Sequence, residues 1–211
     1  GKSTLFDLIS GRLAPSSGQV WLGGQRIDGK PAFEINRLGL SRSFQISSLF
    51  ANLSVFDNLR CGLLWQQGLR YTLFKRLSRL HQANERTEQL MEQVQLSSRR
   101  TTLAANLSYA EQRALELGIT LASGAGVILL DEPTAGMSHT EATAFVQLIR
   151  SVTVAKTLLI IEHDMPVVFG LADKIAVLAQ GELLAFDAPD AVRADARVQA
   201  AYLGAGSSSM V

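Results

Sequence analysis

The most constraining feature of the chain is the alternation of short apolar runs and longer amphipathic segments in its second half. Apolar runs of strand length are separated there by segments of helix length. The expected elements are helices at 109–121, 140–151 and 166–171, and strands at 127–130, 158–161, 174–178 and 183–186. This βαβ order predicts an α/β fold with a mainly parallel sheet and helices packed on it.

The strand expected at 127–130 is followed by two acidic residues. Its run Val-Ile-Leu-Leu is apolar throughout, as in a central strand buried on both faces. Asp131 and Glu132 come directly after it, at the strand end where open α/β folds bind ligands. Asp131 can hold Mg²⁺ through a water, and Glu132 can orient or deprotonate an attacking water. The alternative is a strand that runs into a solvated acidic turn.

The first half predicts a different mixture of elements. A helix is expected at 3–10, closed by Gly11, and antiparallel strands at 19–22 and 25–27 are joined by a Gly-Gly turn. A further strand is expected at 40–44, ending at Gln45. Residues 54–95 form a helical region that begins with Ser54 as a cap. Near its end, Leu90, Met91 and Val94 form one apolar face.

The chain begins with Gly1-Lys2-Ser3-Thr4, followed by an apolar helical pattern. These residues match the second half of the phosphate-binding motif G-x-x-x-x-G-K-[ST] and so indicate ATP or GTP chemistry. We expect the first half of the motif, and the strand that leads into it, before residue 1. The alternative is a chance match, because four residues alone specify little.

A second candidate anion site lies one helix upstream of Asp131. Ser108 followed by Glu111 forms a capping-box pattern, which predicts that a helix starts here. Free N–H groups and the dipole at a helix N-terminus attract anions. The alternative is a helix cap without any ligand.

Composition excludes several classes of protein. The net charge is +1, which gives no electrostatic basis for binding nucleic acid. The single cysteine, Cys61, excludes an internal disulfide framework and fits a reducing compartment. No apolar run has the ~18–20 residues that cross a bilayer. We expect the first residues to belong to the fold and not to a signal peptide.

Taken in order, the motifs resemble the ATP-binding subunit of an ABC transporter. The matching segments are the end of the phosphate loop (Gly1 to Thr4), a Q-loop glutamine (Arg42-Ser43-Phe44-Gln45), a signature (Leu107-Ser108-Tyr109-Ala110-Glu111), a Walker B strand ending at Glu132, a D-loop (Thr134-Ala135-Gly136-Met137) and a switch histidine (Ile161-Glu162-His163-Asp164). The resemblance implies a P-loop NTPase core of the RecA-like type with an antiparallel β segment, an inserted helical subdomain and its first core strand missing. The implied core is 1–46 with 112–203, the helical and signature subdomain is 47–111, and 204–211 is a flexible tail.

The resemblance also implies roles for the matching residues. Gly1, Lys2, Ser3 and Thr4 would bind the phosphates of ATP, with Ser3, Gln45 and Asp131 around the Mg²⁺. Glu132, His163 and Gln45 would be the catalytic residues. Ser108, Tyr109 and Ala110 would reach the ATP bound by a second subunit of a head-to-tail dimer.

Two residues depart from the family's signature. Ala110 stands where the family has glycine, and alanine is tolerated there only if the backbone has ordinary helical φ. If the position needs a positive φ, the contact with the second subunit's nucleotide weakens, and we expect a modest loss of turnover. Glu111 stands where many members have glutamine, and it brings a negative charge near a triphosphate site.

Within the family, the chain is most similar to ATP-binding subunits of branched-chain amino acid importers. The supporting segments include 41–45, the signature tyrosine, 161–165 and 198–204. The implied partners are transmembrane permease subunits, a second ATP-binding subunit (the same chain or a different one) and, indirectly, an extracytoplasmic substrate-binding protein, with no nucleic acid. The implied location is the cytoplasmic face of the plasma membrane. Two alternatives stay open: a soluble ABC ATPase outside transport, and a truncated, non-catalytic ABC domain.

Overall fold

A three-stranded parallel sheet lies at the centre of the molecule. The computed structural model describes residues 1–43, 49–66 and 77–206. The strand order is β3 (Leu40–Arg42), β4 (Val127–Asp131) and β5 (Thr157–Ile161). Val127 pairs with Leu40 on one side and with Thr157 on the other, so β4 is the central strand. Residues 128–131 of β4 are all buried, which confirms the prediction from its apolar run.

The other strands form two separate antiparallel ribbons. β1 (Trp21–Leu22) pairs with β2 (Gln25–Arg26), as predicted. β6 (Ile175–Ala179) and β7 (Glu182–Asp187) also pair antiparallel, so the prediction of a mainly parallel arrangement was wrong for these two strands. Only Gln180 and Gly181 connect them, with φ values of 51° and 90°. A two-residue turn with positive φ makes a hairpin, whereas a parallel pair needs a crossover of a dozen residues or more.

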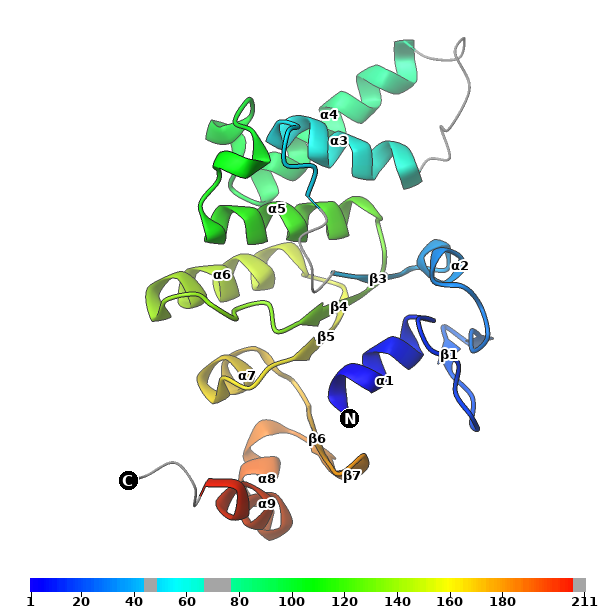
Figure 1. Ribbon diagram of the computed structural model, residues 1–211, viewed down its shortest axis with the longest axis vertical. Helices are drawn as coiled ribbons and strands as arrows, with labels where there is room; N and C mark the ends of the chain where they lie inside the picture. The colour runs from blue at the N-terminus through cyan, green and yellow to red at the C-terminus, as the bar shows by residue number, and fades with distance from the viewer. Residues whose placement is uncertain (44–48, 67–76, 207–211) are drawn as a thin grey trace.

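Helices cover the sheet and extend one end of the molecule (Figure 1). Their bounds are α1 (Lys2–Ile9), α2 (Ala32–Arg37), α3 (Val55–Gln66), α4 (Leu77–Gln93), α5 (Tyr109–Ala122), α6 (His139–Val152), α7 (Met165–Leu171), α8 (Pro189–Ala194) and α9 (Ala196–Gly206), with short 3₁₀ helices η1 (Ser97–Arg99) and η2 (Ala104–Asn106). Ser54 caps α3 by accepting a 3.0 Å hydrogen bond from the Asp57 N–H, as predicted. α9 continues to Gly206, so three residues of the predicted flexible tail are helical.

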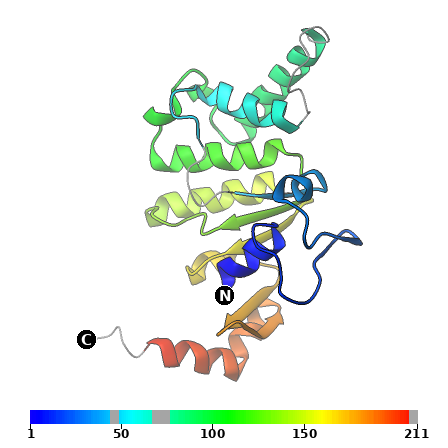
Figure 2. The ribbon, with the colours of Figure 1, turned by 45° about the vertical axis from the view of Figure 1, so that its right-hand side comes forward.

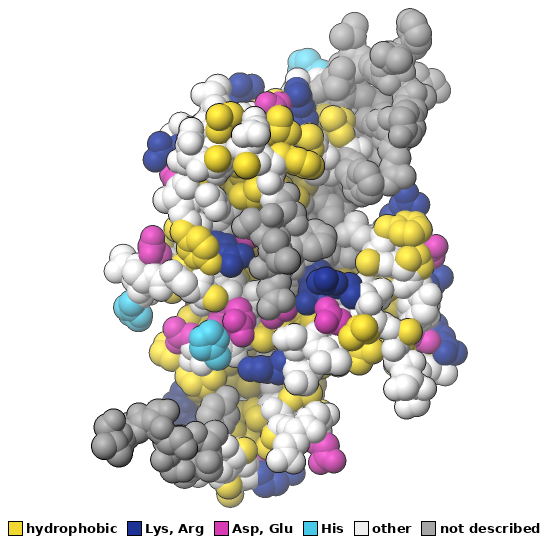
Figure 3. All heavy atoms as spheres, in the orientation of Figure 1, with side chains coloured by type: hydrophobic (Ala, Val, Ile, Leu, Met, Phe, Trp, Pro, Cys, Tyr) yellow, Lys and Arg dark blue, Asp and Glu magenta, His cyan; other side chains and the backbone are white. Residues whose placement is uncertain are grey.

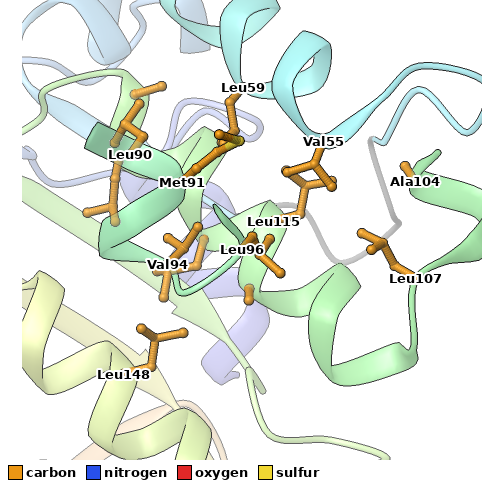
Figure 4. Close-up of a cluster of buried hydrophobic side chains, with 14 of the residues drawn as sticks. Val55, Leu59, Leu90, Met91, Val94, Leu96, Ala104, Leu107, Leu115 and Leu148 are labelled. Atoms are coloured by element: carbon orange, nitrogen blue, oxygen red, sulfur yellow. The ribbon is translucent and has the colours of Figure 1, made fainter. Parts of the chain in front are cut away.

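One hydrophobic cluster joins the helical region to the sheet. α3, α4 and α5 contribute fully buried side chains, and β4 and α6 complete the same cluster. Figure 4 shows Leu59 beside Met91 and Leu115 beside Val55 within it. Leu90, Met91 and Val94 are all buried here, which confirms the predicted apolar face of α4. The predicted boundary between residues 111 and 112 falls inside α5, whose buried face belongs to this shared core.

A second, smaller cluster anchors α1 against the sheet. It contains Phe6 of α1, Ile35 of α2, Leu40 of β3, Leu129 of β4 and Ile161 of β5. Figures 1 and 2 both show the N-terminal end of α1 on the side toward which the arrows of β4 and β5 point. The sequence-predicted residues at the start of α1 and at the ends of these strands therefore face the same side of the molecule.

Candidate functional site

The first turn of α1 presents polar side chains to solvent. The helix begins directly after Gly1, which caps it without a side-chain hydrogen bond. Lys2, Ser3 and Thr4 are exposed, while Phe6 is only 2% exposed and holds the helix in the core. This helix has no acidic residue in its first turn. The open N–H groups, the positive end of the dipole and the Lys2 ammonium together make a terminus suited to phosphate.

The carboxyl ends of β4 and β5 bring Glu132 and His163 together. Glu132 follows β4 with φ +46°, a left-handed conformation that is uncommon outside glycine. Its N–H donates to the Ile161 carbonyl at 2.9 Å, which fixes it to the end of β5. The Nδ1 atom of His163 lies 3.7 Å from Oε1 of Glu132, and both side chains are open to solvent. Figure 3 shows acidic and basic side chains gathered near the middle of this face.

A buried ionic network links Asp131 to α1, and sequence reasoning missed it. Nη2 of Arg42 donates to Oδ2 of Asp131 at 3.0 Å, and Nη1 donates to Oδ1 of Asp7 at 2.6 Å. Nη1 also donates to the Ser10 hydroxyl at 3.1 Å. The Arg42 and Asp131 side chains are 7% and 2% exposed. Arg42 therefore neutralises Asp131 and connects three elements: α1, β3 and β4.

The turn after Glu132 is held by a buried carboxylate. Glu162 is the first residue after β5, and its side chain is 1% exposed. Its Oε1 accepts from the Thr134 N–H at 3.1 Å and from the Thr134 hydroxyl at 2.6 Å. Its Oε2 accepts from the His163 N–H at 3.2 Å. Glu162 thus joins the backbone segments that carry Glu132 and His163.

The predicted capping box at the start of α5 is confirmed. The Ser108 hydroxyl accepts from the Glu111 N–H, and the Glu111 carboxylate accepts from the Ser108 N–H at 2.8 Å. Ala110 lies inside α5, so its backbone is helical, and this is the alternative in which alanine is tolerated. The structure thereby removes the physical reason for expecting a loss of turnover at this position.

The charge of Glu111 is balanced within the same subunit. Arg99 Nε donates to Glu111 Oε1 at 2.7 Å. The hydrogen bond from the Ser108 N–H, followed by the one from Arg99, holds the pKa of the Glu111 carboxyl below its usual range. The acidic residue in the signature is therefore neutralised by Arg99.

The described side chains fit a magnesium–phosphate ligand better than a metal held by protein alone. No group of three or more His, Cys, Asp or Glu side chains in the described part of the chain is arranged as a metal site. Mg²⁺ is commonly held by one or two protein oxygens together with phosphates and water. Exposed Ser3 at an electropositive helix terminus matches that donor set directly, and Asp131, whose side chain is buried against Arg42, fits it through a water.

Comparison with known proteins decides the family. The profile of the family described as ABC transporter matches residues 1–135. The chain belongs to the ABC transporter family. The profile described as branched-chain amino acid ATP-binding cassette transporter matches residues 182–207 of this ABC protein. The second match covers β7, α8 and α9.

Individual relatives agree with this membership. The ABC protein is 33% identical over 213 residues to LivG of Escherichia coli K12, named a high-affinity branched-chain amino acid transport ATP-binding protein, with 97% of this chain and 83% of LivG covered. BraF of Pseudomonas aeruginosa, with the same description, gives the same identity and coverage. The ADP conformation of an ATP-binding cassette of an ABC transporter superposes with a TM-score of 0.81 at 25% identity, covering 97% and 84% of the two chains. The P-loop NTPase fold predicted from the sequence is therefore confirmed.

Some predicted residues are not brought together within this ABC protein. Gln45 lies outside the described residues. Among the described residues, Ser108, Tyr109 and Ala110 form no hydrogen bond with residues 1–4. None of the described helices is long and apolar enough to cross a bilayer.

Proposed function

We propose that this ABC protein binds and hydrolyses ATP as the energy-supplying subunit of a branched-chain amino acid importer. The observation that supports this substrate class most directly is the match of residues 182–207 to the branched-chain amino acid cassette family. The names of the LivG and BraF relatives point to the same class. The start of α1 and the carboxylates at the ends of β4 and β5 are the groups that would bind and hydrolyse ATP.

In this proposal, the start of α1 binds the triphosphate. Gly1 and its neighbours offer backbone N–H groups, Lys2 pairs with the β- and γ-phosphates, and Thr4 donates to a phosphate oxygen. Ser3 would hold Mg²⁺ directly and Asp131 through a water, with Gln45 as a third residue around the ion. Bound Mg²⁺ neutralises phosphate charge in phosphoryl transfer. Arg42 orients the Asp131 carboxylate through their 3.0 Å hydrogen bond.

The hydrolytic residues are proposed to be Glu132, His163 and Gln45. Glu132 is open to solvent and near His163, so it can orient a water molecule and accept its proton. His163 lies 3.7 Å from Glu132 and would contact the γ-phosphate, and Gln45 would sense metal and phosphate. Glu162 holds both backbone segments in register through its bonds to Thr134 and His163.

The site is proposed to be completed by a second ATP-binding subunit. Ser108, Tyr109 and Ala110 at the open end of α5 would contact the nucleotide bound by that subunit, and closure of the dimer would drive the permease subunits. The assembly would sit at the cytoplasmic face of the membrane through those permeases and receive its cargo from an extracytoplasmic binding protein.

Nucleotide binding and turnover by the full chain test this proposal. We expect micromolar binding of a fluorescent Mg·ATP analogue, and ATPase activity that falls by roughly 10²–10⁴-fold in Glu132→Gln with binding retained. His163→Ala should also lose activity, whereas His139→Ala, at an exposed histidine with no predicted role, should not. Binding without any hydrolysis by the wild type would favour the non-catalytic alternative and overturn the proposal.

A further inference from the structure

Tyr109 forms a long-range contact for which the proposed function gives no role. It is the first residue of α5 and is 44% exposed, yet its hydroxyl donates to the Ala135 carbonyl at 2.8 Å. Its ring also lies against Gly136, where an added Cβ would lie 3.4 Å from the hydroxyl oxygen and 3.5 Å from two ring carbons. Gly136 has φ +80°, a conformation that side chains rarely adopt. The signature tyrosine is therefore packed on the turn that follows Glu132.

The direction of this hydrogen bond is fixed by Arg113, one turn further along α5. Nε and Nη2 of Arg113 donate to the Tyr109 oxygen at 3.0 and 2.7 Å. A guanidinium can only donate, so the tyrosine oxygen accepts from it and the hydroxyl proton is directed to Ala135. Nη1 of Arg113 donates to Glu116 at 2.9 Å, which holds the guanidinium in place. The tyrosine hydroxyl is thus aligned on the turn by α5 itself.

The contacted residue is directly connected to Glu132. The Ala135 N–H donates to the Glu132 carbonyl at 3.1 Å, and the Met137 N–H donates to the Thr134 carbonyl at 3.1 Å. Thr134 is in turn bonded to buried Glu162. The turn therefore has two anchors, one from the end of β5 and one from the start of α5. Movement of the start of α5 would therefore pull on the carbonyl of Ala135, the residue whose own N–H is bonded to Glu132.

We propose that Tyr109 is a positioning residue that couples the start of α5 to the backbone of Glu132. Since the start of α5 is proposed to meet the second subunit's nucleotide, this link makes the geometry of Glu132 in one site depend on engagement at the other. The inference rests on the proposed role of Glu132 in ATP hydrolysis. It assigns the Tyr109 hydroxyl to its own subunit, and the proposed contact of residues 108–110 with the partner's nucleotide then falls to the other atoms at the start of α5.

Tyr109→Phe tests the link, because it removes one hydroxyl and keeps the ring. In the nucleotide-free full chain, hydrogen exchange at the Ala135 and Met137 amides should accelerate roughly two- to tenfold, the range expected for one hydrogen bond. In the assembled transporter, kcat for ATP should fall by a similar factor while KM stays unchanged. Ser151→Ala is the matched control, since that hydroxyl donates to Leu148 of its own helix, and neither quantity should change.

Two results would overturn the proposal. Unchanged exchange at both amides would show that the hydroxyl does not hold the turn. A raised KM with unchanged kcat would show that the Tyr109 hydroxyl itself touches nucleotide. A wild-type protein without ATPase activity would overturn the proposed function instead, and the exchange rates would still decide whether Tyr109 holds the turn.

Discussion

Replacing Arg42 by methionine should strongly destabilise the fold. The substitution removes the guanidinium that pairs with both Asp7 and Asp131. Asp131, whose side chain is 2% exposed, is left as an unpaired buried charge. Loss of one partner from a buried ion pair costs about 3–5 kcal/mol. Loss of the Asp7 contact costs less free energy of unfolding, because the Asp7 side chain is 28% exposed and partly screened by water. We therefore expect the free energy of unfolding to fall by about 3–5 kcal/mol, a large part of the roughly 5–15 kcal/mol typical of a domain.

Urea denaturation of three further variants separates this cause from general damage to the core. Arg42→Lys should be intermediate, because an ammonium cannot make the same two-pronged contact. The double variant Arg42→Met/Asp131→Asn should lose less stability than the sum of the single variants, since no buried charge is left unpaired. Lys30→Met breaks a solvent-exposed pair with Glu34 and should cost no more than about 1 kcal/mol. An Arg42→Met loss below about 1 kcal/mol, or strict additivity in the double variant, would refute the reasoning.

Three further predictions concern the shared core and the start of α5. Leu115→Ala opens a cavity at a fully buried position and should lower the free energy of unfolding by about 2–5 kcal/mol in urea titrations; a loss below about 1 kcal/mol would show that the core does not join α5 to the sheet. The pKa of Glu111 is lowered in the folded state, chiefly by the Ser108 N–H and then by Arg99, so its carboxylate stabilises the fold at neutral pH, and this stabilisation is lost as pH falls through the folded-state pKa. The stability difference between wild type and Glu111→Gln should therefore shrink from about pH 7 to about pH 3, and a constant difference would contradict the assignment. Ala110→Gly should lower stability by up to about 1 kcal/mol without raising ATPase turnover, and faster turnover would show that the helical alanine does impair the site.

Local patterns in the sequence were sufficient to predict the elements that carry the site. The apolar run at 127–130 and the Ser108–Glu111 spacing each determine a strand or a helix start from neighbouring residues, and both were confirmed. The helices α2 and α8 were not predicted, although Pro31 caps the first and Pro189 opens the second. Proline at the start of a helix is the signal that could have identified them.

The contacts between elements could not be predicted in the same way. Arg42 is separated from Asp7 by 35 residues and from Asp131 by 89, so its role depends on how α1, β3 and β4 pack. Tyr109 and Ala135 are likewise 26 residues apart. A charged residue within the strand expected at 40–44 was the only signal in the sequence for the Arg42 network. The positive φ of Glu132 has no such signal, because it follows from the turn between β4 and α6.

Uptake of radiolabelled leucine into vesicles tests the proposed importer function most directly. The chain would be assembled with its permease subunits and binding protein, and uptake and ATP hydrolysis would be measured together for wild type and Glu132→Gln. We predict ATP-dependent uptake that stimulates hydrolysis, with both abolished by Glu132→Gln while Mg·ATP still binds. A hydrolysis rate that leucine, isoleucine and valine do not change would contradict the proposed role in branched-chain amino acid import. Uptake that persists in Glu132→Gln would contradict the proposed role of Glu132.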